Sequence, residues 1–254
     1  LLYLAGLATF TNLSVPQLNP RFIIIVMIGG LAQIAGTGLL VSLFDKRNFA
    51  VGTTYSKTET VQAAIFGIFF LGELVSLNAA IGILVSLAGV IAISVARSPA
   101  GLRAIATAWT ERPALIGLAS GASFGVAAVS YRGASLSLGG DGFLMQASFT
   151  LAFVLVFQTI VMAAYMAMRE PAELRASLAA WRVAMWVGLS GAVASIGWFT
   201  AMTIQQAALV RALGQIELVF TIASSTLIFR ERILRLELIG IILVVAGIVI
   251  LLLR

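Results

Sequence analysis

The sequence contains no cysteine and no histidine, and Asp45 and Asp141 are its only aspartates. Without these residues the chain cannot form disulfides, use thiol chemistry or offer imidazole ligands to a metal. An intramembrane protease or a metal-dependent hydrolase needs groups that this chain lacks, because both aspartates fall in expected loops. We therefore expect a protein that is not an enzyme and that uses no cofactor or metal.

Charge is also scarce. Charged residues make up 10% of the chain and hydrophobic residues 61%, whereas an average soluble domain has about 25% and about 45–50%. A soluble fold of 254 residues cannot bury so much apolar surface, so the surrounding medium must be lipid. The net charge of +6 comes from residues scattered singly among loops, which excludes nucleic acid as a partner. We expect a multi-pass protein of the cell (inner or plasma) membrane.

A membrane helix needs about 20 mostly apolar residues. Residues 1–13 are apolar but too short to cross a bilayer, and Pro16 and Pro20 follow them. The expected spans are 21–43, 50–71, 77–96, 113–134, 142–168, 181–204, 207–229 and 235–253.

The chain repeats itself, because residues 48–96 and 206–254 align without a gap at an offset of 158. Each copy has two glutamates 14 residues apart and two glycines 9 and 16 residues after the second glutamate. The matching pairs are Glu59 with Glu217, Glu73 with Glu231, Gly82 with Gly240, and Gly89 with Gly247. A duplicated membrane unit with a glutamate inside a helix of each copy is typical of transporters.

The same offset places residues 1–10 on 159–168 and leaves the helix 113–134 without a counterpart. We therefore expect that the sequence lacks one helix and about half of the next, and that the intact bundle has ten. A signal peptide at 1–10 is the alternative, but a basic n-region and a small-residue cleavage site are missing. The expected domains are a first repeat over 1–98, N-terminally truncated, a loop over 99–112 and a second repeat over 113–254.

Five helices per copy is an odd number, so the two copies must lie inverted in the membrane. The loops support this: 44–49, 97–112, 169–182 and 229–235 together hold 11 Lys and Arg, and the other side holds Arg21, Arg132 and Arg254. By the positive-inside rule the first side is cytoplasmic, which puts both termini outside. The expected fold is an all-α integral membrane protein of two inverted five-helix repeats, with about eight full helices and a partial one present.

Stripes of small residues predict close helix–helix seams, because lipid gives helices no hydrophobic drive to associate. A contact between two copies of the protein in a homodimer is the other interpretation. The stripes are Gly117, Gly121 and Gly125; Gly82, Ser86 and Gly89; and Gly188, Gly191 and Ser195.

Copy one reads TETVQAAIFGIFFLGELVSLNAAIGILVSLAGVIAIS and copy two reads IELVFTIASSTLIFRERILRLELIGIILVVAGIVILL. Both resemble the EamA-type half of the drug/metabolite transporter (DMT) superfamily, in which a Glu-bearing helix ends in an FLGE-like turn and an IGxxLIxxGV helix follows. The resemblance covers the last two helices of each half. It implies ten helices, a central cavity, and export or exchange of amino acids, nucleosides, related metabolites or amphipathic drugs. It also implies cytoplasmic termini, whereas the loop charges place both termini outside. The family's usual proline is replaced by Val61 and Val219, which makes a helix kink there uncertain.

Glu59 and Glu217 fall near mid-bilayer, where a charge costs at least ~2.5–3.5 kcal/mol and should face the bundle interior or water. We expect them to bind substrate or a coupling proton; the alternative is a structural role, paired with a neighbouring helix or a basic residue. Lys57 cannot meet Glu59, because positions two apart face opposite sides of a helix. Lys57 with Glu217, or Arg211 with Glu59, is geometrically possible. We expect Lys57 to face the cavity and Arg211 to snorkel to the interface.

Other polar or aromatic side chains within helices are candidates to line the path. An aromatic residue in a membrane helix is more often a packing residue or an interface anchor. The candidates for substrate or proton binding are Tyr55, Gln62, Gln215 and Trp198, and the weaker ones are Gln33, Tyr131, Gln146 and Gln158.

The favoured function is secondary transport by alternating access, most simply as an exporter or exchanger of small metabolites. The sequence has no Walker-type phosphate loop, so a proton gradient or the solute gradient would drive it. Lys57 and two glutamates would suit a zwitterion or a small amphipath. The alternatives are a lipid-linked carrier or flippase on the same scaffold, and a non-transporting membrane scaffold.

Overall fold

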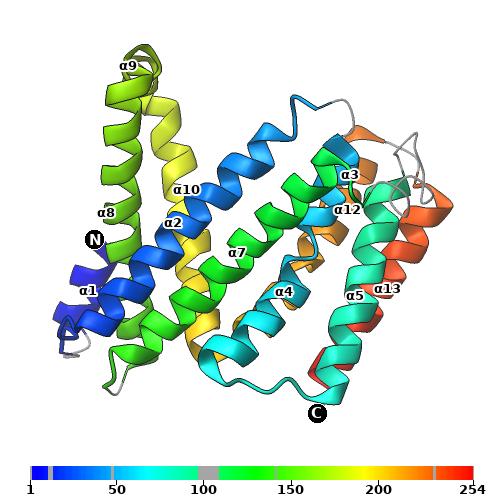
Figure 1. Cartoon of the computed structure of the whole chain (residues 1–254), viewed down its shortest axis with the longest axis horizontal. Coiled ribbons are helices and arrows are strands. Elements are labelled where there is room, and N and C mark those ends of the chain that lie inside the picture. Colours follow the sequence, from blue (N-terminus) through cyan, green and yellow to red (C-terminus); the bar gives the residue numbers. More distant parts are fainter. Residues whose placement is uncertain are drawn as a thin grey trace. The chain divides into compact units, whose positions relative to one another are not determined.

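The computed structural model describes residues 2–10, 14–46, 49–96, 109–140, 142–230 and 233–253, and every regular element in these ranges is a helix (Figure 1). Seven described segments are long and apolar enough to cross a membrane. Six are single helices and the seventh is Ala207–Ile228. The six are α2 (Pro20–Ser42), α5 (Leu77–Ala96), α7 (Arg112–Ser137), α8 (Phe143–Arg169), α10 (Trp181–Ile204) and α13 (Arg235–Leu252). The all-α membrane class is confirmed.

The two spans that carry Glu59 and Glu217 are broken, which corrects the prediction of continuous helices over 50–71 and 207–229. The first consists of α3 (Phe49–Ser56), α4 (Glu59–Phe66) and the π-helix η1 (Gly67–Leu71); the second consists of α11 (Ala207–Gly214) and α12 (Ile216–Phe229). The first and last residues of α11 lie 158 positions after the first and last residues of α3, which is the offset of the repeat. The break is therefore duplicated along with the sequence, although neither copy has a proline there.

Local hydrogen bonding explains the first break. The hydroxyls of Ser56 and Thr58 donate to carbonyls three residues earlier, at 2.8 and 2.7 Å. The backbone N–H groups of Lys57 and Thr58 also bond three residues back, in the tight pattern of a 3₁₀ turn. In the second copy the N–H of Gln215 makes the same short step, directly after Gly214. Hydroxyl groups in one copy and a glycine in the other therefore accompany the break.

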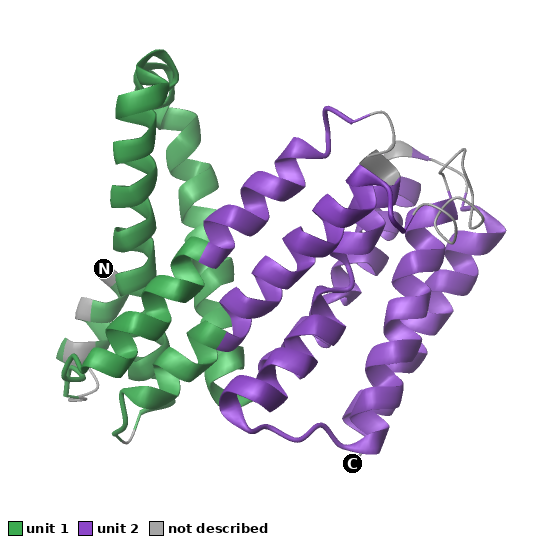
Figure 2. Cartoon of the chain, viewed as in Figure 1, with its two compact units in different colours: residues 1–31, 130–205 green, residues 32–129, 206–254 purple. Residues whose placement is uncertain are grey.

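Two compact units make up the chain (Figure 2). Unit 1 combines residues 1–31 and 130–205, and unit 2 combines residues 32–129 and 206–254. Each unit therefore draws on both sequence copies. Unit 1 contains α1 (Leu2–Phe10), α8, α9 (Pro171–Ala179) and α10, whereas unit 2 contains α3 to α5 and α11 to α13. The predicted loop 169–182 thus includes a short helix, α9.

Glycines form the seam between α5 and α13, which lie side by side and antiparallel in unit 2 (Figure 1). A Cβ atom on Gly82 would lie 2.7 Å from the carbonyl oxygen of Gly247, and one on Gly89 would lie 2.6 Å from that of Gly240. The close seam predicted for residues 77–96 is confirmed. Under the offset of 158, Gly82 corresponds to Gly240 and Gly89 corresponds to Gly247, so each of the two contacts is the equivalent of the other. A two-fold axis between inverted copies would produce this relation.

The close seam predicted for the glycine face of α7 is confirmed, and its partner is the broken helix that carries Glu59. A Cβ on Gly117 would collide with the backbone carbonyl of Gly52, and one on Gly121 would lie 2.8 Å from the carbonyl oxygen of Ser56. A Cβ on Gly121 would also lie 3.3 Å from the backbone nitrogen of Glu59. This contact fixes the backbone at the helix break against α7.

The third predicted seam, on α10, is wrong for the part of the chain that the structure describes. A Cβ on Gly188 or Gly191 would meet no other described atom within 4 Å. The surrounding turns of α10 are exposed, with Trp186 at 67%. Small residues permit a close approach but do not supply the partner helix.

Unit 1 is held by aromatic and polar contacts. The ring of Phe22 lies 5.7 and 5.4 Å from those of Phe149 and Phe153. Tyr131 donates its hydroxyl to the carbonyl of Gly29 at 3.1 Å and stacks on Phe199, with 4.7 Å between ring centroids. These contacts join α2, α7, α8 and α10 within this unit.

Candidate functional site: ion pairs at two helix breaks

The two repeated glutamates stand at helix N-termini inside the membrane spans. Glu59 is the first residue of α4, and Glu217 is the second residue of α12. Unpaired N–H groups give a helix N-terminus partial positive charge, which stabilises a nearby carboxylate. Each break therefore provides a favourable environment for a negative charge within an apolar span.

Each glutamate also pairs with a cation from the other copy. Lys57 Nζ lies 3.3 Å from Glu217 Oε1, and Arg211 Nη2 lies 3.1 Å from Glu59 Oε2. These are the two pairings that the sequence allowed. All four residues belong to unit 2, and the two cations balance the two anions.

The expectation that Arg211 snorkels to the interface is wrong. The side chain of Glu59 is only 13% exposed, and that of Arg211 is 23% exposed. A carboxylate buried in a membrane protein is costly unless a cation or donors compensate it. The pairing with Glu59 therefore outweighs the access of Arg211 to water, and the guanidinium also lies 5.9 Å from the ring centroid of Phe124.

Two glutamine side chains flank these pairs in unit 2. Gln62 donates its amide to the Thr58 hydroxyl at 3.0 Å and to the Leu118 carbonyl at 3.4 Å. Gln215 is 4% exposed and donates to the Thr60 hydroxyl at 3.4 Å. The buried Oε1 of each glutamine has no hydrogen-bond partner among the described residues. A bound polar molecule could satisfy these acceptors.

The remaining candidates have other surroundings. Tyr55 packs against Val51 and Ala114, and its role in binding stays a prediction. Trp198 lies half-buried on α10 in unit 1, whereas the four charged residues belong to unit 2. In the same unit, Gln158 donates to the Gly30 carbonyl at 3.1 Å.

The structure describes hydrogen bonds of three weaker candidates, Tyr131, Gln146 and Gln33, and their place along a transport path stays a prediction. The Tyr131 hydroxyl both donates to α2 and accepts from Gln158 at 3.3 Å. Gln146 donates to two glycine carbonyls of the loop before α8. The backbone carbonyl of Gln33 accepts the Thr37 hydroxyl within α2.

Sequence reasoning missed the residues that act from neighbouring helices. Phe124 lies between Gly121 and Gly125 on α7, but only the fold shows that Arg211 reaches it. Arg132, counted only as a loop-side charge, donates to the carbonyls of Met202, Thr203 and Gln205 at 2.7–3.2 Å. It thereby satisfies carbonyls at the C-terminus of α10. Over the described ranges, no three His, Cys, Asp or Glu side chains gather to hold a metal.

Discontinuous membrane helices with charged groups at their breaks are characteristic of transport proteins. The sequence model of the EamA-like transporter family matches residues 112–253, more than half of the chain. The chain belongs to the EamA-like transporter family and is a multi-pass membrane transporter of the DMT type.

A solved structure described as "Crystal structure of protein" is similar in fold, with a TM-score of 0.67 and 21% identity over 97% of this chain and 79% of that one. A comparison with curated proteins finds no match.

Proposed function

We propose that this transporter is a secondary carrier of small zwitterionic or amphipathic metabolites, such as amino acids. The observation that carries the proposal is the pair of cross-copy ion pairs at two helix breaks. Lys57–Glu217 and Arg211–Glu59 place two positive and two negative groups in two broken helical segments whose other residues are mostly apolar.

Charge balance favours this class of substrate. The four charges sum to zero, so a bound zwitterion would leave the membrane interior neutral. A solute with a single net charge would leave one unbalanced charge there, which is costly in a low-dielectric medium. A proton taken up by Glu59 or Glu217 would compensate an anionic solute.

Transport would proceed by alternating access, with the two inverted repeats rocking around the broken helices. A proton gradient or the solute gradient would supply the driving force. We further propose export or exchange across the cell (inner or plasma) membrane. Association of two copies stays a prediction.

Uptake into liposomes that contain the purified protein tests this proposal. A panel of labelled amino acids and nucleosides is offered with and without a pH gradient, beside protein-free liposomes. We expect protein-dependent uptake of at least one zwitterion. Its absence for every amino acid, in protein that remains folded, would contradict the assigned substrate class.

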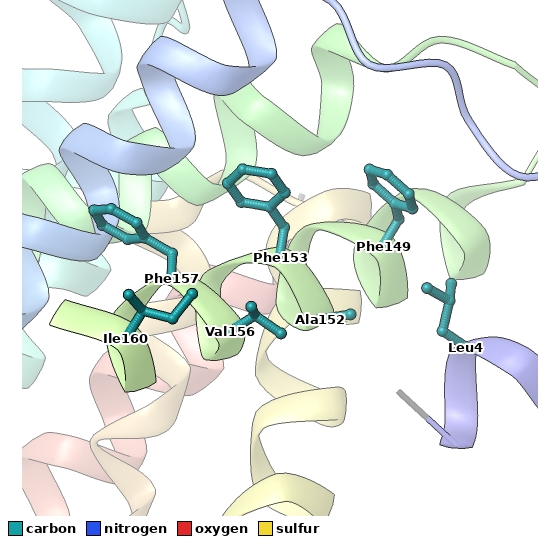
Figure 3. A pocket seen from close by; sticks show the side chains of 7 residues that line it. All are labelled: Leu4, Phe149, Ala152, Phe153, Val156, Phe157 and Ile160. Carbon is teal, nitrogen blue, oxygen red and sulfur yellow. The ribbon is translucent and has the colours of Figure 1, made fainter. Parts of the chain in front are cut away.

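An apolar groove in unit 1 favours a second candidate, the transport of lipid-linked compounds. The groove has a volume of about 350 Å³, and all of its lining side chains are apolar. Phe149, Phe153 and Phe157 project from one face of α8, and Leu4 of α1 stands at one end (Figure 3). This lining suits a hydrocarbon chain. Protein-dependent movement of a fluorescent phospholipid between the leaflets, without amino-acid flux, would favour this candidate.

A further inference from the structure

The two ion pairs differ in how far they are buried. In Arg211–Glu59 the side chains are 23% and 13% exposed, whereas in Lys57–Glu217 they are 28% and 60% exposed. A charged pair that faces a water-filled cavity gains little from pairing, whereas a buried pair is costly to break. The equivalent glutamates, Glu59 and Glu217, therefore take part in pairs of different strength.

Arg211–Glu59 is held from three helices. Arg211 on α11 meets Glu59 on α4 at 3.1 Å and lies over Phe124 of α7. The backbone of Glu59 is itself packed against Gly121 and Gly125 of α7. Separating these two side chains would leave a buried carboxylate without its cation.

Lys57–Glu217 is less constrained. Lys57 lies in the two-residue turn between α3 and α4, and its ammonium approaches Glu217 through one contact of 3.3 Å. A lysine ammonium is a compact charge on a flexible stem, so it accepts a new carboxylate without a fixed geometry. In copy two the position equivalent to Lys57 is Gln215, so the cation occurs in one copy only.

We propose that the two pairs have separate roles. Arg211–Glu59 is a permanent clamp that joins the broken helices of the two copies, whereas Lys57–Glu217 opens and Lys57 then binds the carboxylate of the transported solute. The second role rests on the transport function proposed above. The first role does not depend on transport.

Thermal unfolding of the purified protein tests the clamp. The single variants are Arg211→Gln, Glu59→Gln, Lys57→Gln and Glu217→Gln, and the exposed Glu173→Gln and Arg175→Gln on α9 serve as matched controls. We expect either change at the clamp to lower the unfolding temperature by at least about 5 °C. Changes at Lys57 or Glu217 should shift it by less than about 2 °C, as the controls do. Equal shifts for the two pairs would overturn the division of roles.

Amine labelling tests the opening pair, because Lys46 and Lys57 are the only lysines in the sequence. The protein in liposomes is treated with an amine-reactive reagent, and each lysine is quantified by mass spectrometry, with Lys46 as internal standard. Glu217→Gln should raise Lys57 labelling at least threefold, and Glu59→Gln should not.

The solute arm uses 10 mM L-leucine and, as a probe without a carboxylate, L-leucinamide. Leucine should lower Lys57 labelling at least twofold and leucinamide should not. Equal effects of the two compounds, or none, would overturn the carboxylate role of Lys57. The labelling of Lys57 does not require flux. If leucine lowers Lys57 labelling but the transport assay shows no uptake, the result counts against transport and not against the contact between Lys57 and the carboxylate.

Discussion

At the residue scale, each cation of the site meets a glutamate of the other copy, Lys57 with Glu217 and Arg211 with Glu59. Spacing shows that Lys57 and Glu59 face opposite sides of one helix. It does not show which neighbouring helix each side chain meets. The preference for Arg211 at the interface failed because the burial of Glu59 is a property of the packing on α7, and that packing is not visible along the chain.

Gln215 is the residue at which a structural role and a binding role are easiest to separate. Its buried Oε1 lacks a described partner, and its amide makes one long hydrogen bond of 3.4 Å to the Thr60 hydroxyl. An apolar side chain of similar size at this position therefore costs the fold little stability. We expect Gln215→Met to leave the unfolding temperature within about 2 °C of the parent while raising the KM of transport several-fold. The measurements are thermal unfolding and uptake against solute concentration, with the exposed Gln17→Met as control. An unchanged KM would show that Gln215 does not contact the solute.

At the element scale, the order of helices and the ends of most of them could be predicted from hydropathy. The breaks at Lys57 and Gln215 could not, because the usual cue, a proline, is absent in both copies. The hydroxyls of Ser56 and Thr58 compete locally for backbone carbonyls, an effect too common in helices to predict a break alone. The close approach of Gly121 then stabilises the turn from outside.

The α5–α13 seam gives a direct stability prediction. A Cβ on Gly82 meets the Gly247 carbonyl at 2.7 Å, whereas one on Gly38 of α2 meets nothing within 4 Å. Gly82→Ala should destabilise the protein by about 1–3 kcal/mol through overpacking. Gly38→Ala should stabilise it by about 0.8–1 kcal/mol, the helix preference of alanine over glycine. Unfolding temperatures measure both, and a stabilising Gly82→Ala would contradict the described seam.

Arg132 is expected to act as a cap of α10 rather than as a solute ligand. Its guanidinium serves three carbonyls at the end of that helix, and hydrogen bonds to charged groups contribute about 1.5–3 kcal/mol. Arg132→Leu should therefore lower the unfolding temperature by several degrees, and Arg132→Lys by less. The exposed Arg175→Leu is the control. A normal unfolding temperature with lost flux would instead place Arg132 in the transport path.

At the scale of the whole molecule, the duplication is the strongest signal in the sequence. It identified the four glycines that line the α5–α13 seam, where Gly82 meets Gly247 and Gly89 meets Gly240. It did not predict the two compact units, because each of them combines helices from both copies. The two units depend on contacts between helices of different copies. The repeat shows which positions are equivalent, but it does not show which helices of the two copies pack together.

The inverted arrangement predicts that equivalent loop positions face opposite sides of the membrane. Ser76 and Leu234 are equivalent under the offset of 158, and the native chain has no cysteine to interfere. In intact cells, Ser76→Cys should react with a membrane-impermeant thiol reagent. Leu234→Cys and Arg175→Cys should react only after permeabilisation. Labelling of Ser76→Cys and Leu234→Cys from the same side would rule out inversion.

Flux through the two carboxylate variants is the most direct test of the proposed mechanism. Uptake by liposomes is measured for the parent, Glu59→Gln, Glu217→Gln and the control Glu173→Gln, with and without a pH gradient. We predict that Glu217→Gln lowers flux at least tenfold while the protein stays folded, and that Glu59→Gln lowers flux together with stability. The control should keep the flux of the parent. Unchanged flux in both site variants would contradict a role for the paired carboxylates in transport and leave them a structural role alone.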